Sequence, residues 1–126
     1  MTYKILMVDD EPDLDMMIQQ RFRKEIRDKI YHFYFARHGL DALDIVKNYP
    51  DISVVLSDLN MPEMNGFELL KALKIEYPHL KIVILSAYGD QDNKSSALNA
   101  GADDFIIKPL VLSELSEKLK QLTGNI

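Results

Sequence analysis

The chain has 126 residues, a formal net charge of −5 and 47% hydrophobic residues, which fits one domain with a single core and excludes a disordered acidic chain. It has no cysteine, which excludes disulfides, thiolate zinc sites and cysteine nucleophiles and agrees with a reducing, cytoplasmic compartment. Its longest apolar runs have four residues, against about 20 for a membrane span, and its negative charge disfavours direct nucleic-acid binding. We therefore expect neither membrane insertion nor a nucleic-acid partner.

Five short β-type runs recur along the chain. Four are almost continuously apolar, as expected for strands buried on both faces of a parallel sheet. The second run is aromatic and more mixed, which favours an edge position. The runs cover residues 3–8, 31–35, 52–56, 81–85 and 105–107.

Helical patterns separate these runs, and in each the apolar residues recur at helical spacing. The first pattern leaves Met16 off the face that we expect to be buried. The helix over 91–100 is polar and small, and Gly101 is a signal for its end. The apolar residues expected to face inward are Leu14, Met17, Ile18, Phe22 and Ile26; Leu40, Leu43 and Ile45 or Val46 over 39–48; Phe67, Leu69, Leu70 and Leu73 over 66–75; and Leu112, Leu115, Leu119 and Leu122.

Strands that alternate with helices predict an α/β fold, with parallel pairing and right-handed crossovers that place helices on both faces of the sheet. The five β–α units use the whole chain. We therefore predict one domain over 1–126, with 1–123 as its core and 124–126 as a frayed end or the start of a linker. An Asn65-Gly66 pair suggests a hairpin turn, but the helical stripe after it favours a helix start.

Acidic residues follow two of the strands. Asp9 and Asp10 follow the first run and Asp58 follows the third, and parallel strands bring these ends to one edge, where open α/β sheets bind ligands. Two like charges at ~4 Å cost about 4 kcal/mol at an effective dielectric near 20, so the pocket needs compensation. Lys108 supplies one positive charge, and an all-oxygen ligand set selects a hard cation such as Mg²⁺. With Ser86 nearby, this predicts phosphoryl chemistry.

Four motifs now stand in order along the chain, and together they resemble the receiver domain of bacterial two-component response regulators over essentially all 126 residues. The resemblance implies a flavodoxin-like, doubly wound, five-stranded parallel sheet of order 2-1-3-4-5 with five helices. The motifs are Val8-Asp9-Asp10-Glu11-Pro12, Ser57-Asp58-Leu59-Asn60-Met61-Pro62-Glu63-Met64-Asn65-Gly66, Leu85-Ser86-Ala87 and Gly101-Ala102-Asp103-Asp104-Phe105-Ile106-Ile107-Lys108-Pro109.

The resemblance also implies a reaction. Asp58 would accept a phosphoryl group from a sensor histidine kinase or a phosphotransfer protein. Mg²⁺, or Mn²⁺ in its place, would be held directly by Asp10 and Asp58, through water by Asp9 and through the backbone carbonyl of Asn60. Lys108 would pair with the carboxylate and then with the phosphoryl group.

A switch follows from the same resemblance. Ser86 would hydrogen-bond the phosphoryl group, Phe105 would turn into the vacated space, and Pro109 would follow a cis peptide bond. The surface of the helix 91–100, the strand 105–107 and the last helix would then present itself to an output domain or target protein. Dimerisation through this surface stays open. Asn60 and Tyr88 would tune the lifetime of the phosphoryl group.

The family role is that of a signalling switch that phosphorylates and slowly dephosphorylates itself, rather than a turnover enzyme. One alternative is a Mg²⁺-dependent phosphohydrolase, but it needs a general acid/base two residues after the nucleophile, where Asn60 stands. Another is a phosphorylation-independent receiver-like interaction module. Such modules usually lose a site residue, and this chain keeps them all.

Basic residues concentrate in one segment. Residues 21–37 carry a net charge of +4 and hold all four arginines, so the rest of the chain carries −9. A solvated helix face is the default interpretation, and docking of an acidic partner is the alternative. Kinases of the family dock against the first helix, so contact with Met16 is a further hypothesis.

Overall fold

A computed structural model of the chain describes residues 2–61, 63–87 and 91–124. Within them, five strands alternate with helices, and six helices are present instead of the five expected. The strands are β1 (Tyr3–Val8), β2 (Tyr31–Ala36), β3 (Ile52–Asp58), β4 (Lys81–Ser86) and β5 (Asp104–Ile107). The helices are α1 (Pro12–Arg21), α2 (Arg23–Arg27), α3 (Gly39–Asn48), α4 (Gly66–Glu76), α5 (Gln91–Asn99) and α6 (Leu112–Thr123).

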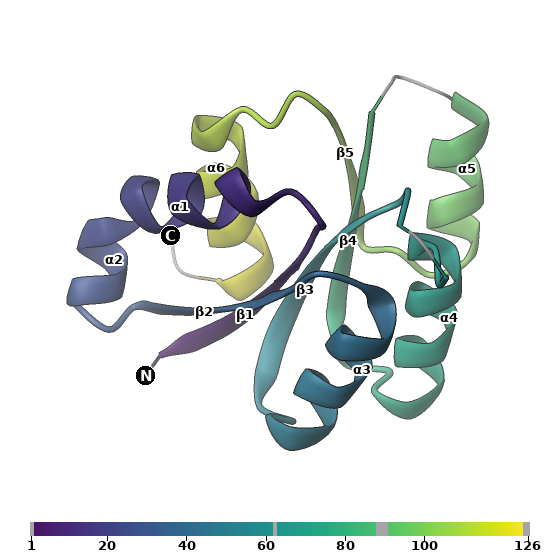
Figure 1. Cartoon of the computed structure of the whole chain (residues 1–126), viewed down its shortest axis with the longest axis horizontal. Helices are drawn as coiled ribbons and strands as arrows, with labels where there is room; N and C mark the ends of the chain where they lie inside the picture. Colours follow the sequence, from purple (N-terminus) through teal and green to yellow (C-terminus); the bar gives the residue numbers. More distant parts are fainter. Residues whose placement is uncertain (1, 62, 88–90, 125–126) are drawn as a thin grey trace.

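The strands form one parallel sheet of order β2-β1-β3-β4-β5, which confirms the expected order and the edge position of β2. Helices α1, α2 and α6 lie on one side of the sheet and α3, α4 and α5 on the other (Figure 1). The order reverses between β1 and β3. In such sheets, ligands bind outside the carboxyl ends of the strands at this point.

Two apolar cores, one on each face, hold the sheet between the helices. Along β1, Leu6 and Val8 belong to the core beneath α3, α4 and α5, whereas Ile5 and Met7 belong to the core beneath α1, α2 and α6. All four are at most 1% exposed. Because successive strand residues point to opposite faces, a strand buried on both sides must be apolar throughout, which explains the continuous runs in the sequence.

The extra helix arises where the first helical pattern breaks at Phe22. Helix α1 ends at Arg21 and α2 begins at Arg23, with Phe22 at φ −101° and ψ 21° between them. The Phe22 ring is fully buried, and its centroid lies 5.8 Å from that of Tyr31 and 5.3 Å from that of Phe33. Packing against the aromatic strand thus coincides with the break.

Two residues expected to face inward are exposed instead. Met17 is 44% and Leu40 is 52% exposed. Met17 precedes the buried Ile18 by one position, about 100° around the helix, and Leu40 precedes the buried Ala42 by two, about 200° around it. The buried faces follow Leu14 and Ile18 in α1 and Ala42 and Val46 in α3, so the predicted stripes were wrong at Met17 and Leu40. Met16 is 64% exposed, as expected.

The basic segment lies at the surface. Arg37 pairs with Asp15 at 2.9 Å, and docking of an acidic partner stays a prediction. The cations around α2 are all exposed; they are Arg21, Arg23, Lys24, Arg27 and Lys29. Among the described residues, no helix combines the length and apolar character that a membrane span requires.

A capping box begins α4 directly after the site loop. The Asn65 side chain accepts a hydrogen bond from the Glu68 N–H at 2.9 Å, and the Glu68 carboxylate accepts one from the Asn65 N–H at 3.1 Å. The Asn65-Gly66 pair is therefore a helix start. At the end of α5, Gly101 has φ +106°, the conformation for which glycine is favoured, which confirms its role as a cap signal.

Replacing Asn65 by Ala should lower the free energy of unfolding by about 1 kcal/mol, because the side chain that satisfies a helix N–H is lost. Urea denaturation monitored by circular dichroism measures this change. Asn65→Asp keeps the acceptor oxygen and should remain close to wild type. If both variants lost the same amount of stability, the acceptor oxygen at residue 65 would contribute nothing to the free energy of unfolding.

Candidate functional site

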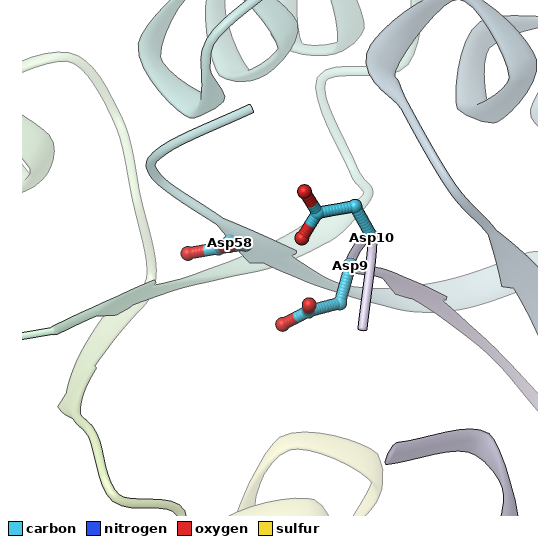
Figure 2. A group of neighbouring side chains, drawn as sticks. All are labelled: Asp9, Asp10 and Asp58. Atoms are coloured by element: carbon cyan, nitrogen blue, oxygen red, sulfur yellow. The ribbon is translucent and has the colours of Figure 1, made fainter. Parts of the chain in front are cut away.

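Three carboxylates converge at the carboxyl edge of the sheet, where β1 and β3 end. Asp9 and Asp10 follow β1, and Asp58 is the last residue of β3. Each offers an oxygen, and these oxygens lie within 4.8 Å of one another. Figure 2 shows the three side chains converging from the two neighbouring strands. The structure thus brings together the acidic residues that the sequence placed at the strand ends.

Asp9 is held on both of its oxygens. Its Oδ1 accepts a hydrogen bond from the Glu11 N–H at 2.9 Å, and its Oδ2 accepts one from Lys108 Nζ at 2.9 Å. The side chain is 2% exposed, so these bonds replace most of its hydration. Asp10, by contrast, is exposed. The cluster therefore joins two buried carboxylates to one that faces solvent.

Lys108 reaches the cluster from the end of β5. Its Nζ lies 2.9 Å from Asp9 Oδ2 and 3.4 Å from Asp58 Oδ2, so the closer partner is Asp9. Its backbone N–H donates to the carbonyl of Ser86 at 2.6 Å. The Lys108-Pro109 bond is cis, as expected from the resemblance.

Burial and charge act against each other in this pocket. Burial raises the pKa of Asp58; the positive charge of Lys108 opposes this, and the negative charge of Asp9 adds to it. Burial alone would lower the pKa of Lys108, but the hydrogen bond to Asp9 and the charges of Asp58 and Asp9 raise that pKa above its usual value. Lys108 is therefore a permanent cation here, and Asp58 is a carboxylate whose ionised form is disfavoured.

The loop between β3 and α4 folds tightly over Asp58. The Asn60 N–H lies 3.4 Å from Asp58 Oδ1, and the Gly66 N–H donates to the Leu59 carbonyl at 2.9 Å. A Cβ atom on Gly66 would lie 2.7 Å from the Asp58 carbonyl oxygen and 2.8 Å from Leu59 Cα. Gly66 is therefore needed for this close approach. The sequence interpretation missed that need because it took Asn65-Gly66 only as a helix start.

Ser86 and Phe105 lie on the next two strands. Ser86 ends β4 and is 3% exposed, and Phe105 in β5 is 8% exposed. Phe105 is paired in register with Ile84 and belongs to the core beneath α3, α4 and α5. Alternation along β4 places Ser86 on the same face as Ile84. Tyr88, expected to influence the phosphoryl lifetime, lies outside the described residues.

The donor set fits a hard divalent cation. Three carboxylates and one lysine leave the cluster with two uncompensated negative charges, and among the described residues no other group of three such ligands comes together. Oxygen ligands without histidine or cysteine select Mg²⁺, Ca²⁺ or Mn²⁺ over softer metals. A small set of carboxylates with room for water is typical of Mg²⁺ sites.

Fold and site together define a doubly wound α/β domain. Its acidic pocket, whose negative charge favours a bound cation, lies where the strand order reverses between β1 and β3. Residues 5–120 match the family model of the response regulator receiver domain. A chemotaxis protein CheY homolog from Campylobacter jejuni is 33% identical over 97% of this chain and 93% of that protein. Sporulation initiation phosphotransferase F from Bacillus subtilis is 35% identical over 96% of this chain and 94% of that protein.

Solved structures agree with these relatives. A receiver domain protein from Clostridium thermocellum has a TM-score of 0.85 at 28% identity, with 98% of this chain and 95% of that chain covered. The CheX-CheY-BeF₃-Mg²⁺ complex from Borrelia burgdorferi contains a chain with a TM-score of 0.84 at 26% identity, with 96% and 89% covered. The chain therefore belongs to the response regulator receiver domain family. It is a domain of phosphorylation-based signalling.

In Mg²⁺-free buffer at neutral pH, Asp58→Asn should raise the free energy of unfolding. Because folding raises the pKa of Asp58, the wild type loses stability as the pH rises through that raised pKa, and an amide does not titrate. The difference in the free energy of unfolding between Asp58→Asn and wild type should therefore shrink as the pH falls toward the ordinary aspartate pKa of 3.8. Urea denaturation across this pH range measures it.

Asp51→Asn is the matched control with the opposite sign. A hydrogen bond from Lys4 lowers the pKa of Asp51, so the ionised form stabilises the fold above the ordinary carboxyl pKa, and the amide should be less stable at neutral pH. If Asp58→Asn also lowered stability at neutral pH, the electrostatic strain assigned to this pocket would be refuted.

Proposed function

We propose that Asp58 is the phospho-acceptor of this receiver domain and takes a phosphoryl group from a sensor histidine kinase or a phosphotransfer protein. The observation that carries the proposal is the convergence of Asp9, Asp10 and Asp58 with Lys108 at the switch point of the sheet. An Asp58 oxygen would attack phosphorus as the bond from phosphorus to the donor's histidine nitrogen breaks. The donor's imidazole then leaves with the bonding electron pair.

The residues present fit Mg²⁺ as the cofactor. Asp10 and Asp58 would hold it directly, Asp9 through water and Asn60 through its backbone carbonyl, with Mn²⁺ as a substitute. A bound divalent cation neutralises negative charge on phosphoryl oxygens during transfer. The chain's own contribution is to fix the carboxylates on β1 and β3 and to place Lys108 beside them, where it offsets charge that develops on the phosphoryl group.

The output of the reaction would be a change on one face of the molecule. A phosphoryl group adds about −1.5 to −2 charge and strong acceptor oxygens, which would draw Ser86 toward it. Phe105 is 8% exposed and packs in the core beneath α3, α4 and α5, which supports an inward position as one end of the proposed ring movement. Three apolar side chains on and around α5, β5 and α6 are 43–46% exposed, and they are Leu98, Ile107 and Val111.

These exposed side chains fit a protein partner, either an output domain or a separate target. The Borrelia burgdorferi relative forms a complex with CheX together with BeF₃ and Mg²⁺, which supports a partner that binds this kind of domain. Dimerisation through the same face stays a hypothesis.

Asp58→Asn should abolish Mg²⁺-dependent labelling by ³²P-labelled acetyl phosphate, because the nucleophilic oxygen is lost. Asp51→Asn removes a carboxylate outside the pocket and should label like wild type. EDTA should prevent labelling of both wild type and Asp51→Asn. Labelling of Asp58→Asn at the wild-type rate would end the assignment. Multiple turnover of a phosphomonoester by the wild type would support the phosphohydrolase alternative, and failure to bind Mg²⁺ would support the interaction module.

Lys108→Ala should slow labelling on the order of 100-fold, because it removes the cation that lies beside Asp9 and Asp58, next to the transferring group. It should also weaken the change that phosphorylation causes in α5, which amide hydrogen exchange measures on the labelled fraction. Lys120→Ala is the control, because Lys120 is a partly exposed lysine of α6 that pairs with Glu117 at 3.7 Å. Wild-type labelling and an unchanged α5 response in Lys108→Ala would remove Lys108 from the mechanism.

A further inference from the structure

Strand β5 is attached to β4 at both of its ends. At the carboxyl end, the Lys108 N–H donates to the Ser86 carbonyl at 2.6 Å. At the amino end, the Asp103 N–H donates to the Ile82 carbonyl at 2.8 Å, and Asp103 Oδ2 accepts from the Ile82 N–H at 2.8 Å. Asp103 and Ile82, at the start of β4, are thus joined by two hydrogen bonds, one donated by the backbone N–H of each residue.

The Asp103 side chain also binds the end of α4. Lys74 Nζ lies 3.1 Å from Asp103 Oδ2 and donates to the Leu80 carbonyl at 2.7 Å. The two side chains are 20% and 23% exposed, so solvent screens this pair less than a surface pair. Lys81 stands 3.9 Å from the other oxygen of Asp103 and is half exposed. Asp103 is therefore the common acceptor for α4 and for the start of β4.

Strand β5 needs such an attachment. It has four residues and lies at the edge of the sheet, paired with β4. The chain enters it from a turn at Gly101, whose φ of +106° is the left-handed conformation. A strand this short makes few ladder bonds, so its register is poorly specified by the ladder itself.

We infer that Asp103, together with Lys74, is a positioning residue that fixes β5 against β4 and so holds Lys108 within reach of Asp9 and Asp58. The inference rests on the proposed function, in which Lys108 serves phosphoryl transfer to Asp58. Asp103 touches none of the reacting groups and acts through the strand. The Asp103 cluster lies at the amino end of β5, and Lys108 directly follows its carboxyl end.

This role predicts a separation between two measurements. The metal ligands come from β1 and the end of β3, so loss of Asp103 should leave the Mg²⁺ dissociation constant unchanged. The rate of labelling at saturating Mg²⁺ should fall about tenfold in Asp103→Ala, since a misplacement of about 1 Å in a positioned group can cost up to about 100-fold. A general loss of stability does not produce this split.

The experiment compares Asp103→Ala, Asp103→Asn and Lys74→Met with wild type. Labelling by acetyl phosphate, calorimetric Mg²⁺ titration and amide hydrogen exchange are measured on each protein. Asp103→Asn keeps an acceptor for the Ile82 N–H, and Lys74→Met leaves Lys81 close to Asp103, so both should slow labelling less than Asp103→Ala. In Asp103→Ala, the amides of residues 105–108 should exchange faster than the loss of global stability explains.

Lys118→Met is the matched control. Lys118 on α6 forms a partly exposed ion pair with Asp104, the residue that directly follows Asp103. The distance between Lys118 Nζ and Asp104 Oδ2 is 2.6 Å. This ion pair ties β5 to α6, and its loss leaves the contacts to β4 in place, so labelling should match wild type after correction for stability.

Wild-type labelling and exchange in Asp103→Ala would overturn the inference, and so would an equal slowing in Lys118→Met. If Asp103→Ala does not fold, faster exchange of the Lys108 amide in Asp103→Asn and Lys74→Met supports the inference, and unchanged exchange overturns it. If wild type itself takes no label, the proposed function fails, and the exchange of the Lys108 amide still decides whether Asp103 positions β5.

Discussion

The ion pairs of Lys108 with Asp9 and Asp58 are the interaction on which the rest of this structure depends. They place a partly buried cation among three carboxylates that would otherwise repel at distances where each pair costs on the order of several kcal/mol. The cation comes from the loop after β5, and the carboxylates come from β1 and β3. The strand order and the position of the edge strand β5 are therefore both conditions for bringing Lys108 to the carboxylates.

The pairing is unequal, and this inequality separates the roles of the two buried carboxylates. Asp9 receives two hydrogen bonds at 2.9 Å. Among the described residues, the donors closest to the Asp58 carboxylate are Asn60 N and Lys108 Nζ, each at 3.4 Å. Longer contacts leave the oxygens of Asp58 less strongly neutralised. Burial also disfavours the charged form of Asp58 and raises its pKa. Asp9 is therefore the anchor for Lys108, whereas Asp58 is the more weakly paired of the two buried carboxylates.

Periodicity was enough to predict the five strands, because strands buried on both faces must be apolar at every position. The order of the strands came from the resemblance of the motifs and not from their spacing. The break at Phe22 could not be predicted, since it coincides with ring packing against Tyr31 and Phe33. The close approach at Gly66 and the Lys74–Asp103 pair join segments whose contact no local pattern records. These three features depend on contacts between separate segments, which are ring packing at Phe22, a close backbone approach at Gly66 and an ion pair between Lys74 and Asp103.

The attachment of β5 at both ends determines where a switch movement can occur. A strand bonded to β4 at Asp103 and at Lys108 cannot slide without breaking hydrogen bonds that are partly shielded from water. Helix α5 is bound far more weakly, since among its residues 93–99 only Ala97 is buried, whereas α4 buries Leu69, Leu70 and Leu73. Elements with few buried apolar contacts move at the lowest cost in free energy. A charge added at Asp58 should therefore move α5 while β5 stays in place.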